Sequence, residues 1–145
     1  METFIAGNGP YDAVLAYSHG AQLVASMLAR LCAQNNIPQP FQCAVFISGG
    51  LPYDFHSITN TGKLEYLHAK PNEAWITIPT TNIWGRNDML YPGMSETLSQ
   101  LCQQDWNEKV VHNGGHDIPG SKAKDDLLSC VKAIRRTIDR AVFVQ

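Results

Sequence analysis

Three polar residues in this chain of 145 residues have the types that acyl transfer by a serine nucleophile requires. Ser18 comes first, Asp88 follows 70 residues later, and His116 follows after a further 28. A serine hydroxyl becomes a useful nucleophile when a histidine takes its proton, and a carboxylate holds that histidine in the correct tautomer. The three residues therefore predict a Ser-His-Asp triad, provided that the fold brings them together.

Each of the three residues also has an interpretation without catalysis. Ser18 precedes an apolar stretch and is a typical helix N-cap, whereas Asp88 follows an asparagine in a typical turn pair. His116 is then an ordinary loop histidine. Metal binding is a further alternative, because His112 and His116 are four residues apart. Two glycines between them oppose a helix and no H-E-x-x-H motif is present, so we expect no metal and no cofactor.

The elements that must position these residues alternate between strands and helices. The expected strands are 12–17, 42–48, 80–84 and 108–112. The expected helices are 20–33, 93–104 and 123–142, with a short one near 62–68. This alternation predicts an α/β fold with a mostly parallel sheet of about four strands and flanking helices. Because functional groups of such sheets lie at the carboxyl ends of the strands, the three residues are expected to meet there.

Two of the expected helices carry more detailed predictions. Ser18 lies between an expected strand and an expected helix, as in a nucleophile elbow. Gly20 supplies the small residue that is needed two positions after the serine, because strand and helix are expected to pack closely there. Asn35, Asn36 and Pro38 are expected to end this helix. The last helix is expected to bury an apolar stripe: Leu127, Val131, Ile134, Ile138 and Val142. Its basic residues favour a solvated helix face over a nucleic-acid stripe: Lys132, Arg136 and Arg140.

The composition is that of one folded domain. Apolar residues make up 44% and charged residues 17%, which excludes intrinsic disorder. A formal net charge of −2 argues against nucleic acid or an anionic membrane as the main partner. The apolar runs are too short for a membrane span, and the first residues lack a signal-peptide pattern. The cysteines form no C-x-x-C pair, so we expect buried, reduced thiols and a cytoplasmic location: Cys32, Cys43, Cys102 and Cys130.

Four segments carry a resemblance to a known family. They are residues 9–21 (G-P-Y-D-A-V-L-A-Y-S-H-G-A), 45–49 (V-F-I-S-G), 78–88 (I-P-T-T-N-I-W-G-R-N-D) and 114–119 (G-G-H-D-I-P). In this order they are similar to motifs of the fungal family of serine hydrolases. Its members include esterases related to human ovarian-cancer-associated protein 2 and thioesterases of fungal polyketide clusters. The resemblance spans residues 9 to about 140 and implies an α/β-hydrolase fold.

The resemblance implies a role for each site residue. Ser18 corresponds to the nucleophile and His116 to the base. Asp88 corresponds to the acid, and the backbone N–H of His19 to one oxyanion donor. The implied activity is cleavage of a small-molecule carboxylic ester or thioester, free or bound to a carrier protein, through an acyl-enzyme in fungal polyketide biosynthesis. The aromatic residues between the second and third strands are expected to cover the acyl site: Tyr53, Phe55, Tyr66 and Trp75.

The front of the chain departs from the family pattern. Gly9 follows only eight residues, where family members have further strands of the sheet, so we expect a single truncated domain over residues 1–145. The strand at 13–17 is then expected to be an exposed apolar edge. The alternative function is an impaired hydrolase-like remnant with a binding role or none. The intact Ser18, Asp88 and His116 favour the enzyme.

Overall fold

The computed structural model describes residues 1–34, 37–69 and 73–143. The elements, in chain order, are α1 (Glu2–Asn8), β1 (Ala13–Tyr17), α2 (His19–Ala33), β2 (Cys43–Ile47), β3 (Tyr53–Asp54), α3 (Phe55–Thr61), β4 (Glu65–Tyr66), β5 (Thr80–Gly85), α4 (Met94–Gln100), a 3-10 turn (Gln104–Trp106), β6 (Asn107–His112) and α5 (Lys124–Phe143). Within these residues, none of the helices combines the length and the apolar character needed to cross a membrane.

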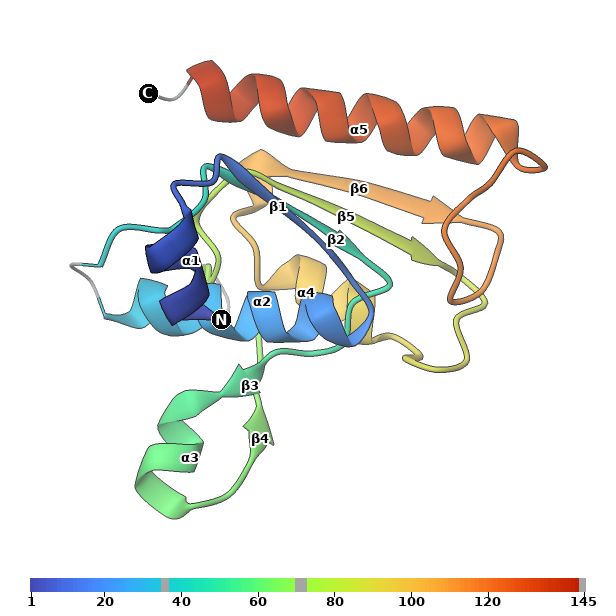
Figure 1. Cartoon of the computed structure of the whole chain (residues 1–145). Coiled ribbons are helices and arrows are strands. Elements are labelled where there is room, and N and C mark those ends of the chain that lie inside the picture. Colours follow the sequence, from blue (N-terminus) through green and yellow to red (C-terminus); the bar gives the residue numbers. More distant parts are fainter. Residues whose placement is uncertain (35–36, 70–72, 144–145) are drawn as a thin grey trace.

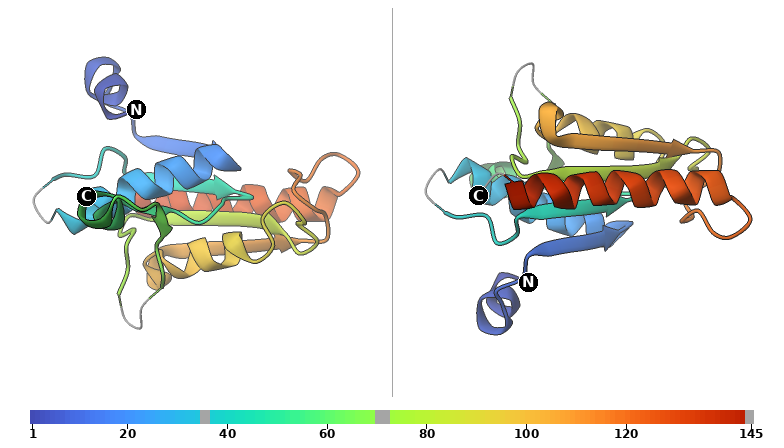
Figure 2. Two further views of the ribbon diagram at one scale, coloured as in Figure 1. Left: turned by 90° about the horizontal axis from the view of Figure 1, so that it is seen from below. Right: turned by 90° about the horizontal axis from the view of Figure 1, so that it is seen from above.

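The main sheet has four parallel strands in the order β1-β2-β5-β6. Helices α2 and α4 cover one face, and α5 lies across the other (Figures 1 and 2). Tyr17 lies opposite Ile47, and Gly85 opposite His112. The carboxyl ends of the strands therefore lie together along one side of the sheet, which we call its carboxyl edge. The predicted α/β fold with about four parallel strands is confirmed, and the residues that follow each strand gather at that edge.

Strand β2 is buried on both faces, as a central parallel strand should be. Ala44 and Phe46 pack toward α2, in a cluster that includes Leu28 and Leu98. Val45 and Ile47 join the cluster on the α5 side. The sheet is thus held between two apolar layers, which gives its carboxyl edge a rigid base.

The segment between β2 and β5 differs from the prediction. The helix expected near 62–68 is wrong, because α3 spans Phe55–Thr61 and Gly62 ends it in the left-handed conformation at φ 70°. The Asp54 carboxylate accepts the amide N–H of His56 at 2.8 Å and caps the start of α3. Short strands β3 and β4 pair antiparallel and close this excursion beyond α2 (Figure 1).

Helices α1 and α4 also differ from the prediction, whereas the end of α2 matches it. Helix α1 was not predicted, since its seven residues include no buried one and show no clear apolar period. Helix α4 ends at Gln100, before the expected end at residue 104, and a separate 3-10 turn follows at Gln104–Trp106. Helix α2 ends at Ala33 as expected, but two of the residues predicted to end it, Asn35 and Asn36, lie outside the described residues.

Helix α5 rests on the sheet with a different face from the predicted one. Its buried residues are Cys130, Ala133, Thr137 and Ala141. Of the predicted stripe, only Ile134 packs against the core on this side of the sheet. The remaining stripe residues are 37% to 62% exposed: Leu127, Val131, Ile138 and Val142. The apolar period correctly predicts the helix, whereas the prediction of its buried face is wrong.

Polar contacts account for this rotation of α5. The buried Thr137 hydroxyl lies 2.7 Å from the Thr81 hydroxyl and donates to the Thr80 carbonyl at 3.1 Å. On one flank, Arg136 and Arg140 pair with Glu108 of β6. These contacts place the small residues of α5 on the sheet, and they leave the larger apolar side chains on the flank away from β6.

Strand β1 forms an edge of the described sheet, as predicted. Leu15 is 63% exposed and Tyr17 is 41% exposed, so the edge is apolar on the α5 side. The thiols of Cys43, Cys102 and Cys130 are free and buried, whereas Cys32 is only partly buried, against the prediction. Burial raises the pKa of the Cys102 thiol to about 11.

Candidate functional site

Ser18 lies in a strained turn between β1 and α2. Its backbone has φ 54° and ψ −124°, a conformation that residues other than glycine rarely adopt. The Ser18 amide donates to the Ile47 carbonyl at 2.8 Å, so the neighbouring strand holds the turn in place. Ser18 occupies the N-cap position of α2, but its hydroxyl makes no capping bond. The hydroxyl is therefore free to point away from the helix, as in a nucleophile elbow.

Gly20 does not have the packing role that the sequence suggested. A Cβ built on Gly20 would meet no described atom within 4 Å beyond its chain neighbours and the backbone of its own helix, so the expected close approach of strand and helix at this residue is wrong. The tight position is Gly49, where a Cβ would lie 2.7 Å from Leu98 Cδ2 and 3.1 Å from Ala21 Cβ. Close packing around the elbow is thus provided by the end of β2.

The hydroxyl of Ser18 begins a chain of hydrogen bonds through all three predicted residues. Ser18 Oγ lies 2.8 Å from His116 Nε2, and His116 Nδ1 lies 2.7 Å from Asp88 Oδ2. The second oxygen of Asp88 accepts the amides of Leu90 at 2.9 Å and Tyr91 at 3.0 Å. Asp88 therefore serves both as the predicted turn residue and as the partner of the histidine.

The Asp88 carboxylate is 7% exposed and fully hydrogen-bonded. Burial by itself raises the pKa of this carboxyl, but the amides of Tyr91 and Leu90 and the His116 ring stabilise the charged form. Together they hold the pKa of Asp88 below its ordinary value. A carboxylate that stays ionised fixes Nδ1 of His116 as the donor, which leaves Nε2 to accept the proton of Ser18.

The loop that carries His116 is pressed against the loop that carries Asp88. A Cβ on Gly85 would lie 2.1 Å from the Gly115 carbonyl oxygen, so only glycine allows this approach. The Asn87 amide donates to the Gly114 carbonyl at 3.1 Å. The Asn87 side chain donates to the Asn113 carbonyl at 2.8 Å. The backbone thus sets the separation of Asp88 and His116.

His112 supports the same loop from within. It is 2% exposed, and its Nδ1 accepts the amide N–H of Gly114 at 3.1 Å. Its Nε2 is buried without a hydrogen-bond partner among the described residues. The Nδ1 contact ties His112 to the turn that precedes His116. The described ranges contain no group of three or more His, Cys, Asp and Glu side chains that could hold a metal ion.

Two tyrosines flank His116, and the sequence reasoning missed both. The Tyr17 hydroxyl donates to the His116 carbonyl at 2.5 Å, and its ring centroid lies 5.4 Å from the imidazole. The Tyr91 ring meets the imidazole edge-on at 5.2 Å. The sequence signal that could have identified them is their position, since Tyr17 directly precedes Ser18 and Tyr91 follows Asp88 by three residues. These contacts restrict the rotation of the His116 side chain.

Helix α2 begins directly after Ser18, at His19. The first N–H groups of a helix have no acceptor within it and carry the positive end of the helix dipole. The backbone N–H of His19 is one of these groups. A negative oxygen that develops beside Ser18 would therefore meet a favourable electrostatic environment.

The excursion between β2 and β5 does not lie over Ser18. It packs below the middle and the far end of α2, whereas Ser18 lies at the start of that helix (Figure 1). Tyr53 is anchored there, because its amide donates to the hydroxyl of Ser26 at 2.9 Å. The expectation that these aromatic residues cover the acyl site is therefore wrong for the described residues.

Known proteins are similar to this chain in sequence and in fold. Esterase FPY3 of Fusarium mangiferae is 34% identical over 98% of this chain and 63% of its own length. Esterase OVCA2 of Xenopus tropicalis is 31% identical over 77% of this chain and 43% of its own. The chain thus spans less than two thirds of the length of these relatives. A solved structure from Agrobacterium vitis S4 shares the fold, with a TM-score of 0.59 and 15% identity over 94% of this chain and 64% of its own.

The family match covers the strand ends that carry all three site residues. Residues 1–127 match the family described as serine hydrolase (FSH1). This range includes Ser18, Asp88 and His116. The resemblance inferred from the four sequence segments is confirmed, and the chain belongs to the FSH1 family of serine hydrolases.

Proposed function

We propose that this chain is a serine hydrolase that cleaves a carboxylic ester or thioester. The observation that carries the proposal is the continuous chain of hydrogen bonds from Ser18 through His116 to Asp88. In this proposal Ser18 is the nucleophile, His116 the general base and then the general acid, and Asp88 the residue that orients the histidine. The backbone N–H of His19 contributes to binding of the oxyanion.

The reaction proceeds in two halves. Ser18 Oγ attacks the substrate carbonyl carbon while His116 Nε2 takes the hydroxyl proton, and the carbonyl electrons move onto the oxygen. Collapse of this intermediate expels the alcohol or thiol, which receives the proton from His116, and leaves an acyl group on Ser18. Water then attacks the acyl carbon, gives its proton to His116, and releases the carboxylic acid as Ser18 is reprotonated.

The substrate class is a small acyl ester or thioester. A fungal polyketide pathway is the setting that the sequence resemblance implies, and the scattered cysteines support a cytoplasmic location in this proposal. Thioesters of coenzyme A or of a carrier protein therefore belong among the substrates to be tested, together with simple esters. Ser18 attacks both classes in the same way, since they differ only in the leaving group.

Labelling with a fluorophosphonate tests the proposal. This probe forms a covalent bond with a serine whose hydroxyl is activated by a neighbouring base. We expect labelling of the folded wild type and of a matched control, Ser129→Ala, whose serine is exposed on α5. Ser18→Ala and heat-denatured protein should remain unlabelled. Equal labelling of Ser18→Ala, or no labelling of wild type that circular dichroism shows to be folded, would refute the proposal.

A further inference from the structure

Ser18 and His116 come from opposite edges of the described sheet. Strand β1, which ends next to Ser18, is one edge strand, and β6, which precedes the loop that carries His116, is the other (Figure 2). The loop after β6 therefore crosses the ends of β5 and β2 before His116 meets Ser18. The distance between the two side chains thus depends on the contacts that hold this loop along its crossing.

The first part of the crossing is fixed at β5. A Cβ on Gly85 would lie 2.1 Å from the Gly115 carbonyl oxygen, and the Asn87 amide donates to the Gly114 carbonyl at 3.1 Å. Both contacts join the loop to the segment that carries Asp88. They place the loop relative to Asp88, and another contact is needed to place it relative to β1.

Tyr17 provides the contact to β1. It is the last residue of that strand and directly precedes Ser18. Its hydroxyl donates to the backbone carbonyl of His116 at 2.5 Å, and its ring centroid lies 5.4 Å from that of the imidazole. One hydrogen bond thus joins the residue beside the nucleophile to the main chain of the base.

The end of β1 depends on few other contacts. Among the described strands β1 pairs with β2 alone, so its second side has no hydrogen-bonded neighbour there. The Ser18 amide bonds to the Ile47 carbonyl at 2.8 Å, which holds Ser18 to β2 but not to the loop of His116. The Tyr17 hydroxyl therefore connects two segments that the sheet itself does not join. A displacement between them would lengthen the 2.8 Å separation of Ser18 Oγ and His116 Nε2.

We propose that Tyr17 is a positioning residue for proton transfer from Ser18 to His116. Its hydroxyl holds the main chain of His116 at the end of β1, and this keeps Nε2 within reach of the Ser18 hydroxyl. The role rests on the proposed function, because it is a role in that reaction. Tyr17 does not touch the transferred proton, so it acts only through the position of His116.

Hydrogen exchange tests the contact without any reaction. Tyr17→Phe keeps the ring and removes the hydroxyl. Tyr11→Phe is the matched control, because Tyr11 is 39% exposed, Tyr17 is 41% exposed, and the Tyr11 hydroxyl has no hydrogen-bond partner among the described residues. We expect the amides of residues 113–118 to exchange about threefold faster or more in Tyr17→Phe, measured by mass spectrometry, and at the wild-type rate in Tyr11→Phe.

The kinetics of fluorophosphonate labelling test the consequence for the reaction. We expect Tyr17→Phe to lower the labelling rate at saturating probe by about tenfold, because small displacements of a reacting group slow it strongly. The half-saturating probe concentration and the final extent of labelling should stay the same. A merely structural role would instead lower the final extent, since part of the protein would be unfolded. Replacement of Tyr17 by 4-aminophenylalanine, whose N–H can also donate to the His116 carbonyl, should restore most of the rate.

The outcomes separate this inference from the proposed function. If Ser18-dependent labelling occurs but Tyr17→Phe is labelled as fast as Tyr11→Phe, the role of Tyr17 is refuted and the proposed function stands. Equal exchange of the loop in the two variants also refutes the role of Tyr17. A folded wild type that is not labelled refutes the proposed function and the role of Tyr17 in it together. Thermal unfolding of each variant confirms beforehand that it is folded.

Discussion

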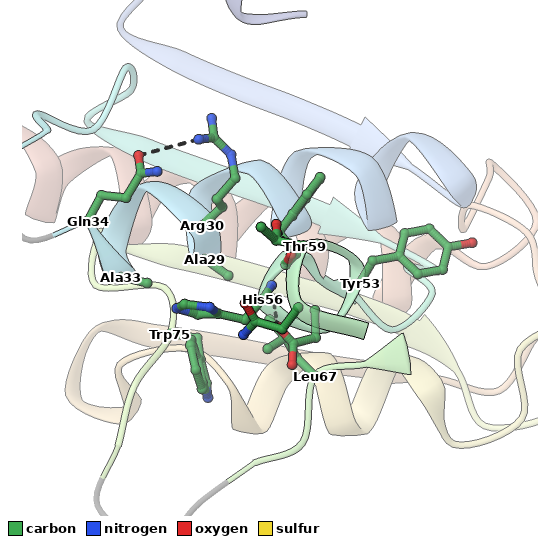
Figure 3. A pocket seen from close by; sticks show the side chains of 12 residues that line it. Ala29, Arg30, Ala33, Gln34, Tyr53, His56, Thr59, Leu67 and Trp75 are labelled. Atoms are coloured by element: carbon green, nitrogen blue, oxygen red, sulfur yellow. Dashed lines mark hydrogen bonds between the residues drawn. The ribbon is translucent and has the colours of Figure 1, made fainter. Parts of the chain in front are cut away.

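The two ends of α2 present different kinds of site. At the first end, Ser18 has a strained backbone, and each of the three polar side chains is hydrogen-bonded to the next. At the far end, a cavity of about 320 Å3 has apolar and polar walls, and the Arg30 side chain beside it is bonded to Gln34 and Glu2 (Figure 3). The first arrangement permits one geometry, which a proton transfer needs. The second encloses a space and holds no comparable chain of hydrogen bonds among the described residues.

The difference follows from the chain segments that meet α2. The first end faces the carboxyl edge of the sheet, where adjacent strands deliver their loops at fixed spacing. The far end faces the excursion of β3, α3 and β4, which forms its own two-stranded sheet. A rigid sheet edge can place atoms to a fraction of an ångström, whereas a short excursion can only enclose a space.

The largest effect should come from Asp88→Asn. The asparagine can no longer hold Nδ1 of His116 as the donor, so the imidazole takes the wrong tautomer for accepting the Ser18 proton. We expect the fluorophosphonate labelling rate to fall by about 10³- to 10⁴-fold. The exposed Asp117→Asn is the matched control. A labelling rate within tenfold of the wild type would contradict the role of Asp88.

A smaller effect is expected at His112, which acts on His116 only through the backbone. His112→Phe keeps a buried ring but removes the acceptor of the Gly114 amide, so the turn before His116 loosens. We expect labelling to slow by about 10- to 100-fold, because small displacements of a reacting group have effects of this size.

His112→Asn is the variant that tests the cause. An asparagine side-chain oxygen can accept the amide two residues ahead, as in an Asx turn, and so replaces Nδ1 of His112. We expect this variant to restore most of the labelling rate. Equal loss in the Phe and Asn variants would show that His112 contributes volume alone and not the position of His116.

Much of the first end of α2 could be predicted from sequence. The order and loop positions of Ser18, Asp88 and His116 depend on strand periodicity and local motifs, which one sequence displays. The contacts that refine the site depend on tertiary packing. The tight approach of Gly85 to the Gly115 carbonyl joins two loops from different strands, and no local pattern predicts it.

The errors of the sequence analysis have the same origin. The apolar stripe of α5 gives the helix its period, but the Thr137 and Thr81 hydroxyls decide which side turns inward. Aromatic and polar residues are mixed in the excursion without a clear period. The sequence therefore predicts its helix after Gly62, whereas the helix lies before this residue. Its cavity at the far end of α2 therefore became visible only in three dimensions.

A further test concerns the acid stability of the first end of α2. The pKa of Asp88 is lower in the folded protein than its ordinary value, so its ionised form stabilises the fold above that ordinary value. This contribution should be lost as the pH falls through the folded pKa. We expect the difference in unfolding free energy between the wild type and Asp88→Asn to shrink from pH 7 toward pH 3, measured by urea unfolding. A difference that grows on acidification would contradict the direction of the shift.

The smallest effect is expected at Ser48. Like Ser18 it has a positive φ, but its hydroxyl lacks a histidine partner. Ser48 follows β2 at φ 47°, is fully buried, and its hydroxyl has no hydrogen-bond partner among the described residues. Removing a buried, unpaired hydroxyl relieves a desolvation cost, so Ser48→Ala should leave the unfolding free energy within about 1 kcal/mol of the wild type or raise it. The labelling rate should change less than about twofold, because the Ser48 hydroxyl makes no hydrogen bond to His116 or to any other described residue. If labelling fell as it does in Ser18→Ala, strain at the strand ends rather than the histidine would set the reactivity of this end of α2.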